Sequence, residues 1–122
     1  MTRKRIASII PRVPEKAEQA AIVKLLWTVG ANVYVLGHPS PDDGRAHRGT
    51  GQTKGLPDLM AFVPNRERGG HDLLMIEAKA KGGRLSPAQR AFERSCVDAD
   101  VAHIVGGVDI VIAWLRRRGL VK

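Results

Sequence analysis

The sequence predicts a mixed α/β domain in which a four-stranded sheet is flanked by helices. Three observations support this fold class. A stretch with helical spacing of apolar residues covers 14–30, four short runs rich in β-forming residues follow it, and two further helical patterns lie after the third and fourth runs. The chain has 122 residues, a length that fits a single domain with one modest core.

The first predicted helix covers residues 14–30. Pro14 suits an opening turn and Gly30 suits the end of a helix. Seven residues before the buried positions 22 and 26 stand Glu15 and Gln19, so the apolar stripe continues toward the helix start as two polar residues. Glu18 lies almost as close to this stripe and is a rival for Glu15. The stripe itself consists of Ile22, Leu25, Leu26 and Val29.

The predicted strands cover residues 32–37, 58–63, 73–79 and 101–105. The polar turn at 65–70 is short enough to join the second and third strands as an antiparallel hairpin. Ser86 at the N-cap, Pro87 at the first helical position and Gln89 three residues after the cap predict a helix that runs to about Asp98. We expect this helix to bury Ala88, Phe92, Cys96 and Ala99. A third helix is expected over 109–118.

The third strand ends with a carboxylate and an ammonium group two residues apart, Glu77 and Lys79. Alternation along a strand places Met75, Glu77 and Lys79 on one face. In a hairpin, Asp58 at the start of the second strand meets Glu77 at the end of the third. Two carboxylates with the Ala78 carbonyl form an oxygen-only site of the kind that Mg²⁺ prefers.

Composition limits the classes of partner. Twenty Lys and Arg residues against twelve acidic residues give a net charge of +8, which favours nucleic acid over a membrane as partner. The single cysteine, Cys96, excludes an intrachain disulfide and a cysteine-rich zinc site. No apolar run reaches the roughly 18 residues of a spanning helix, so we expect no membrane partner and a cytoplasmic location.

Two segments are expected to lack regular structure. Residues 1–13 form a basic arm punctuated by prolines, which either touches phosphates or is solvated. Residues 38–56 form a long loop in which basic residues alternate with glycines, a composition that lets backbone approach a phosphate chain. His38 and His47 in this loop lack a neighbouring ligand at zinc spacing, so we assign them as phosphate contacts or solvated residues.

Four motifs together resemble the VRR-Nuc family of the PD-(D/E)xK nuclease superfamily. The resemblance covers about residues 14–115, and its most specific part is the Leu-Ser-Pro-x-Gln stretch at 85–89. It implies a restriction-endonuclease-like core with a mixed four-stranded sheet, so that residues 14–122 form one nuclease domain. The motifs are Glu15 with Gln19, Lys54-Gly55-Leu56-Pro57-Asp58, Ile76-Glu77-Ala78-Lys79, and Gly83 to Gln89.

The resemblance also implies roles for individual residues. Asp58, Glu77 and the Ala78 carbonyl would bind Mg²⁺ or Mn²⁺, and Lys79 would be the catalytic lysine. Glu15 would be the helix-one carboxylate, catalytic and an additional metal ligand, with Gln19 and Gln89 as accessory catalytic residues. Gln89 has a second interpretation as a helix cap. The expected DNA contacts are Arg45, Arg48, Lys54, Lys81 and Arg84.

The resemblance implies a metal-dependent, structure-specific DNA endonuclease. Stand-alone members of the family, found in phages and bacteria, are similar to dimeric Holliday-junction resolvases. We therefore expect a homodimer that acts on branched DNA and takes no small-molecule substrate. The alternatives are a flap or duplex endonuclease, or a DNA-binding module without catalytic activity. Trp114 either supplies interface surface for the dimer or packs beneath its own sheet.

Overall fold

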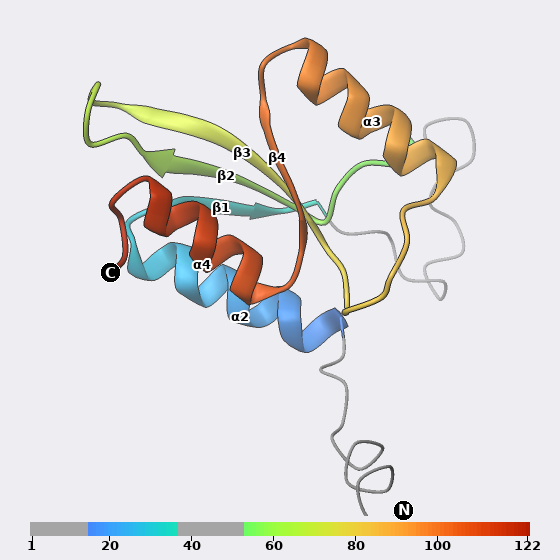
Figure 1. Ribbon diagram of the computed structural model, residues 1–122, viewed down its shortest axis with the longest axis horizontal. Coiled ribbons are helices and arrows are strands. Elements are labelled where there is room, and N and C mark those ends of the chain that lie inside the picture. Colours follow the sequence, from blue (N-terminus) through green and yellow to red (C-terminus); the bar gives the residue numbers. More distant parts are fainter. Residues whose placement is uncertain (1–14, 37–52) are drawn as a thin grey trace, which may run out of the picture.

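The computed structural model describes residues 15–36 and 53–122 (Figure 1). The predicted arm 1–13 and most of the predicted loop 38–56 lie outside these residues. The described elements, in chain order, are α2 (Glu15–Thr28), β1 (Asn32–Val35), β2 (Leu59–Pro64), β3 (His71–Ala78), α3 (Pro87–Asp98), β4 (Ala102–Gly106) and α4 (Val108–Arg117). None of the helices in this part of the chain is long and apolar enough to cross a membrane. The cytoplasmic location stays a prediction.

The four strands form one mixed sheet in the order β1-β2-β3-β4. β2 pairs antiparallel with both β1 and β3, whereas β4 runs parallel to β3. The predicted hairpin between the second and third strands is therefore present, with Leu59 opposite Ile76. On the other side of β3, Met75 lies opposite His103. The predicted fold class, a mixed four-stranded sheet flanked by helices, is confirmed.

Helices cover the two faces of the sheet unequally. Figure 1 shows α2 and α4 together on one face and α3 alone on the other. Alternation along β3 directs Leu74 and Ile76 toward the α2–α4 layer, where they are fully buried. The main core lies between these layers. It consists of Ile22, Leu26, Ala31, Leu59, Ala61, Val63, Leu74, Ile76, Ala78, Ile104, Val111, Leu115 and Leu120.

The start of α3 is closed by the predicted capping box. The Ser86 N–H donates to Gln89 Oε1 at 2.8 Å, and the Gln89 N–H donates to Ser86 Oγ at 3.2 Å. These bonds satisfy two backbone donors that the helix leaves unpaired at its start. Cys96 is buried as expected, but Ala99 is exposed because the helix ends at Asp98 and Ala99 is its C-cap.

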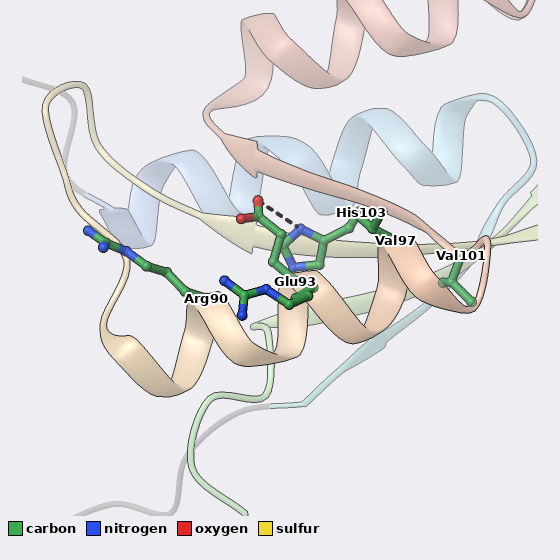
Figure 2. Close-up of a pocket in the computed structure, with 6 residues that line it drawn as sticks. Arg90, Glu93, Val97, Val101 and His103 are labelled. Atoms are coloured by element: carbon green, nitrogen blue, oxygen red, sulfur yellow. Dashed lines mark ion pairs between the residues drawn. The ribbon is translucent and has the colours of Figure 1, made fainter.

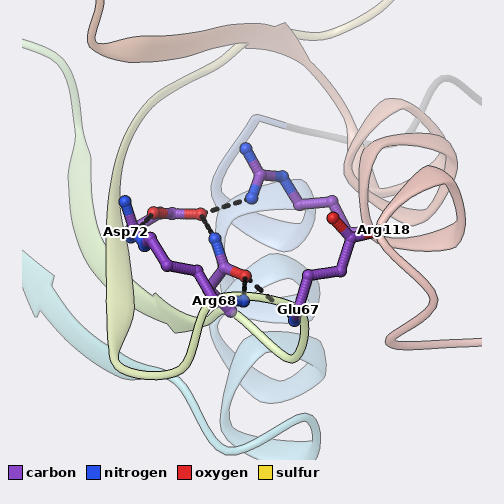
Figure 3. Close-up of polar contacts among 5 residues, drawn as sticks. Glu67, Arg68, Asp72 and Arg118 are labelled. Atoms are coloured by element: carbon purple, nitrogen blue, oxygen red, sulfur yellow. Dashed lines mark hydrogen bonds and ion pairs between the residues drawn. The ribbon is translucent and has the colours of Figure 1, made fainter.

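A network of ion pairs joins the β2–β3 turn to the end of α4 (Figure 3). Asp72 on β3 accepts hydrogen bonds from Asn65, Arg68 and Arg118. The Arg118 guanidinium also lies 4.2 Å from the centre of the Trp114 ring, a cation–π contact. Trp114 is partly buried against the main core, so it packs beneath its own sheet. Its role in a dimer interface stays a prediction.

Candidate active site

Two acidic side chains meet where β2 begins and β3 ends. Asp58 Oδ2 accepts the backbone N–H of Ala78 at 2.9 Å, across a chain separation of 20 residues. The backbone carbonyl of Asp58 accepts the Leu36 N–H at 2.7 Å, which ties the same residue to the end of β1. Extending the β2–β3 register by one residue places Asp58 opposite Glu77. Strand pairing therefore fixes the separation of the two carboxylates.

Among the described residues, Glu77 is the only charged residue that is buried, with 3% of its surface exposed. Burial raises the pKa of Glu77 to about 8, and the hydrogen bond and charge of Asp58 contribute to the increase. The charge of Lys79 opposes it and that of Glu15 adds to it. A buried carboxylate beside a second acid is unfavourable in the ionised state unless a cation compensates the charge.

Lys79 extends the end of β3 toward the start of α2. Its backbone N–H donates to the Gly106 carbonyl at 3.1 Å, so the chain still pairs with β4 at this point. Its side chain is only 17% exposed, and Nζ lies 4.0 Å from Glu15 Oε1. The ammonium group thus lies beside a third acid on the first turn of α2, and its charge also acts on Glu77.

Glu15 and Glu18, the two rivals on α2, have different surroundings. Glu18 Oε2 accepts the backbone N–H of Val108 at the first position of α4. Gly107 is the N-cap of that helix and has no side chain to accept such a bond. Glu18 therefore acts as the cap of α4, whereas Glu15 is the acid that lies beside Lys79.

Gly55 joins two of the motifs that were recognised separately in the sequence. It adopts a φ of +93°, and a Cβ at this position would overlap the Ala88 carbonyl in the first turn of α3. Only glycine allows so close an approach in this backbone conformation. The segment that leads to Asp58 is thereby packed against α3, and the intervening Pro57 is fully buried.

The accessory residues and the expected DNA contacts differ in burial and in their hydrogen bonds. Gln19 is partly buried on α2, one turn after Glu15. Gln89 Oε1 is engaged by the Ser86 N–H, so the cap interpretation of Gln89 agrees with the structure. Among the expected DNA contacts, Lys54, Lys81 and Arg84 are exposed. Arg45, Arg48, His38 and His47 lie outside the described residues.

Sequence reasoning missed a groove between α3 and β4 (Figure 2). It has a volume of about 460 Å³, and Arg90, Val97 and His103 are among the residues that line it. The His103 side chain is 5% exposed, and its Nδ1 lies 3.7 Å from Glu93 Oε2. Burial lowers the pKa of His103, although the charge of Glu93 opposes the shift. The strand and helix periods together could have indicated this pair, because α3 must pack on one face of β4.

The oxygen donors at the strand ends suit a hard metal ion. Within residues 15–36 and 53–122, no three His, Cys, Asp or Glu side chains gather into a metal-binding group. Asp58 and Glu77 form a pair, and Glu15 faces Lys79 instead of completing a triad. Two carboxylates fit an ion that keeps several water ligands, which is the usual behaviour of Mg²⁺ in proteins.

Comparisons with known proteins identify the family and the fold of the domain. The family model for the VRR-NUC domain matches residues 45–109. A solved structure described as a VRR_NUC domain superposes with a TM-score of 0.57 and 17% sequence identity, covering 84% of this chain and 94% of that chain. No curated protein sequence matches this chain. Because the family model covers more than half of the sequence, the chain belongs to the VRR-NUC family, whose domain is of the nuclease type.

Proposed function

We propose that this nuclease-type domain is a metal-dependent, structure-specific DNA endonuclease that hydrolyses phosphodiester bonds. The observation that carries the proposal is the meeting of Asp58 and Glu77 at two paired strand ends, with Lys79 beside them. A buried carboxylate beside a second acid is costly to the fold and is retained in proteins mainly where charge chemistry needs it. The net charge of +8 suits a polyanionic substrate.

The donor set fits Mg²⁺ or Mn²⁺. Asp58, Glu77 and the Ala78 carbonyl would hold the ion, since all three offer hard oxygen ligands. The repulsion that raises the pKa of Glu77 is the kind that a divalent cation offsets. When bound, the ion would polarise the phosphodiester and lower the pKa of a water ligand.

Lys79 and Glu15 supply the proposed proton and charge chemistry of the protein itself. The Lys79 ammonium would orient the attacking water and counter the negative charge that develops on the phosphate. Glu15, 4.0 Å from Lys79 Nζ, would hold the ammonium in position. Gln19 would assist from the next turn of α2. Gln89 would contact substrate through its amide NH₂ group, because its oxygen caps α3.

We propose branched DNA, with the four-way junction as the main candidate, as substrate and a homodimer as the working unit. Resolution of a four-way junction needs two matched cuts, and each chain carries one candidate site. Two chains related by a two-fold axis would present both sites in equivalent positions. Lys54, Lys81 and Arg84 are the described candidates for contacts with the DNA backbone.

The proposal is tested with labelled four-way junctions, flaps and linear duplexes, each incubated with Mg²⁺, Mn²⁺ or EDTA. We expect cleavage of branched DNA with either metal and none with EDTA. Lys79→Ala and Glu77→Gln should reduce the rate by about 100-fold or more, while circular dichroism stays that of the folded wild type. Cleavage by Lys79→Ala at the wild-type rate would refute the site assignment.

The same experiment separates the alternatives. Preferred cutting of flaps or linear duplex would replace the resolvase assignment with a flap or duplex endonuclease. Binding of junctions without cleavage under any metal condition would leave an inactive DNA-binding module. Light scattering at micromolar concentration, with and without junction DNA, tests the dimer, and a strict monomer in both conditions would contradict the dimeric resolvase.

A further inference from the structure

One face of the sheet carries both the carboxylate pair and two exposed aromatic rings. Residues two apart on a strand share a face, so Asp58 has Met60 and Phe62 as its successors on the same side of β2. Tyr34 on β1 lies directly opposite Met60. The face is thus ordered in rows, with the carboxylates of Asp58 and Glu77 in one row and Tyr34 in the next.

Helix α3 covers only the β3–β4 side of this face. The centroid of the Phe92 ring on α3 lies 6.0 Å from that of the His103 ring on β4. Cys96, also on α3, is buried. Figure 2 shows His103 beneath α3, and Figure 1 shows that α2 and α4 occupy the opposite face of the sheet. The β1–β2 side is therefore left without a covering helix among the described elements.

The uncovered part, which we name the aromatic face, consists of Tyr34, Met60 and Phe62. Tyr34 is 49% exposed and Phe62 is 36% exposed. Their rings meet edge to face, with centroids 6.0 Å apart and an interplanar angle of 81°. Two rings in this arrangement support each other and keep their remaining surface open to a flat ligand.

We propose that the aromatic face stacks on unpaired bases of the DNA strand beside the phosphate that is cut. This inference rests on the proposed endonuclease function and deepens it by naming the recognised substrate feature. A strand advances about 3.4 Å per residue, so Tyr34 lies about 7 Å and Phe62 about 14 Å along the sheet from the carboxylate row. A stacked DNA strand advances about 3.4 Å per nucleotide. Both rings are within reach of the first few nucleotides next to the scissile bond.

Unpaired DNA fits this face better than a second copy of the chain does. Each partner of a stable protein interface buries roughly 800 Å², whereas a whole aromatic side chain buries about 150–250 Å², and both rings here are already partly covered. A base needs only one ring face, and aromatic stacking accepts any base. The proposed site of phosphodiester cleavage adjoins these rings, and the net charge of +8 suits a polyanion.

The consequence is selectivity for DNA in which bases are exposed. In a continuous duplex the bases are stacked on one another and are not available to Tyr34 and Phe62. At a flap or at an opened branch point they are available. The aromatic face would therefore add affinity for substrates with unpaired bases, such as a flap or an opened branch point, and none for linear duplex.

The test measures binding of the full chain in EDTA, where cleavage is not expected. The probes are a flap DNA and its matched linear duplex, each with 2-aminopurine one to four nucleotides from the cleaved bond. We expect Tyr34→Ala and Phe62→Ala to weaken flap binding about fivefold or more, with no change for the duplex. Tyr34→Phe keeps the ring and should bind as the wild type does. Trp27→Ala, which removes an exposed ring on α2 on the other side of the sheet, is the matched control.

The fluorescence of 2-aminopurine reports stacking directly. Quenching by the wild type and by Tyr34→Phe, with loss of quenching in Tyr34→Ala, would support the proposal. Wild-type affinity and quenching in both alanine variants would overturn it, as would an equal loss of flap and duplex binding. It would also be overturned if the alanine variants converted a dimer to a monomer in light scattering with quenching unchanged. Absence of cleavage by the wild type with Mg²⁺ and Mn²⁺ would defeat the endonuclease proposal, and that result is read independently of this metal-free assay.

Discussion

Glu18 accepts a hydrogen bond from the backbone N–H of Val108, ninety residues further along the chain. The bond closes the start of α4, which lacks a capping side chain of its own. Glu15 stands on the same helix one turn earlier and faces Lys79 at 4.0 Å. Two similar carboxylates on one helix therefore have different environments, one structural and one at the candidate active site.

This difference predicts that one substitution affects stability and the other affects cleavage. Glu18→Ala removes the cap of α4 and should lower the free energy of unfolding by about 1 kcal/mol, with cleavage unchanged at temperatures where the protein stays folded. Glu15→Ala should leave stability nearly unchanged and slow cleavage. Urea unfolding and cleavage rates measure the two effects. Glu18→Gln keeps an acceptor oxygen and serves as the control; a cleavage defect in Glu18→Ala without loss of stability would contradict the assignment.

The buried Glu77 predicts a pH-dependent gain of stability on substitution. Its pKa is raised from 4.5 to about 8 in the folded protein. Between these values the folded state holds a proton that the unfolded state has released, so stability falls as pH rises and the loss is complete above about pH 8. In metal-free buffer, Glu77→Gln should therefore melt several degrees higher than the wild type at pH 9 and much closer to it at pH 5.

Added Mg²⁺ should remove the higher stability that Glu77→Gln has over the wild type at alkaline pH. An ion bound at Asp58 and Glu77 stabilises the folded wild type by mass action, and Glu77→Gln lacks one of its carboxylate ligands. Increasing Mg²⁺ at pH 8 should raise the melting temperature of the wild type more than that of the variant, as measured by thermal melts. Equal shifts in both proteins would argue against Glu77 as a ligand.

Gly55 predicts a coupling between fold and activity. Gly55→Ala places a Cβ against the Ala88 carbonyl at a φ of +93° and should cost about 1–3 kcal/mol of stability. It should also slow cleavage, because the segment that leads to Asp58 must move away from α3. Gly69→Ala is the matched control, since Gly69 has a φ of +85° with no atom within 4 Å of the added Cβ. Equal behaviour of the two variants would show that the Gly55–Ala88 contact contributes nothing.

Asp72 predicts a loss of stability in acid. Burial raises the pKa of Asp72, but the bonds from Arg118 and Asn65 and the charge of Arg68 outweigh it, so the pKa lies below its ordinary value of 3.8. The network therefore stabilises the protein above pH 3.8, and this contribution is lost as pH falls through the lowered pKa. Asp72→Asn should melt a few degrees below the wild type at pH 7, with the gap closing as the pH falls through the lowered pKa of Asp72. A gap that persists in acid would indicate a packing effect instead.

The charge of the chain predicts salt-dependent DNA binding. The slope of log K against log salt concentration should be about −0.9 for each phosphate neutralised. If Arg84 binds one phosphate, Arg84→Ala should reduce the magnitude of that slope by about 0.9. Arg66→Ala, which alters an exposed arginine at the far end of β2 that donates to the Gly119 carbonyl, is the control. Equal slopes for the wild type and Arg84→Ala would remove Arg84 from the DNA interface.

The sequence predicted best what local spacing determines. Ser86, Pro87 and Gln89 define the start of α3 by contacts within four residues, and the polar turn after β2 joins two strands that are adjacent in the chain. The pairing of Asp58 with Glu77 followed from that hairpin alone. The match of the VRR-NUC family model confirms the family that these motifs indicated.

Long-range contacts set the limit of prediction. Helical periodicity could not distinguish Glu15 from Glu18, because the partner of Glu18 is a backbone group on α4. The exposure of Tyr34 and Phe62 depends on how much of the sheet α3 covers, which no local pattern encodes. The surroundings of Trp114 could not be predicted for the same reason. Arg118 lies above its ring and donates to Asp72, which is in a distant strand.

The antiparallel register between β2 and β3 makes the length of the connecting turn a determinant of chemistry. Asn65 accepts the backbone N–H groups of Glu67 and Arg68, and this fixes the number of residues between the strands. A deletion of one residue in this turn would shift the pairing of β3 by one position and reverse the face on which each side chain lies. Ala78 would then lie opposite Asp58 in place of Glu77. A change at the tip of the hairpin, far from the carboxylates, would abolish the site without altering any residue in it.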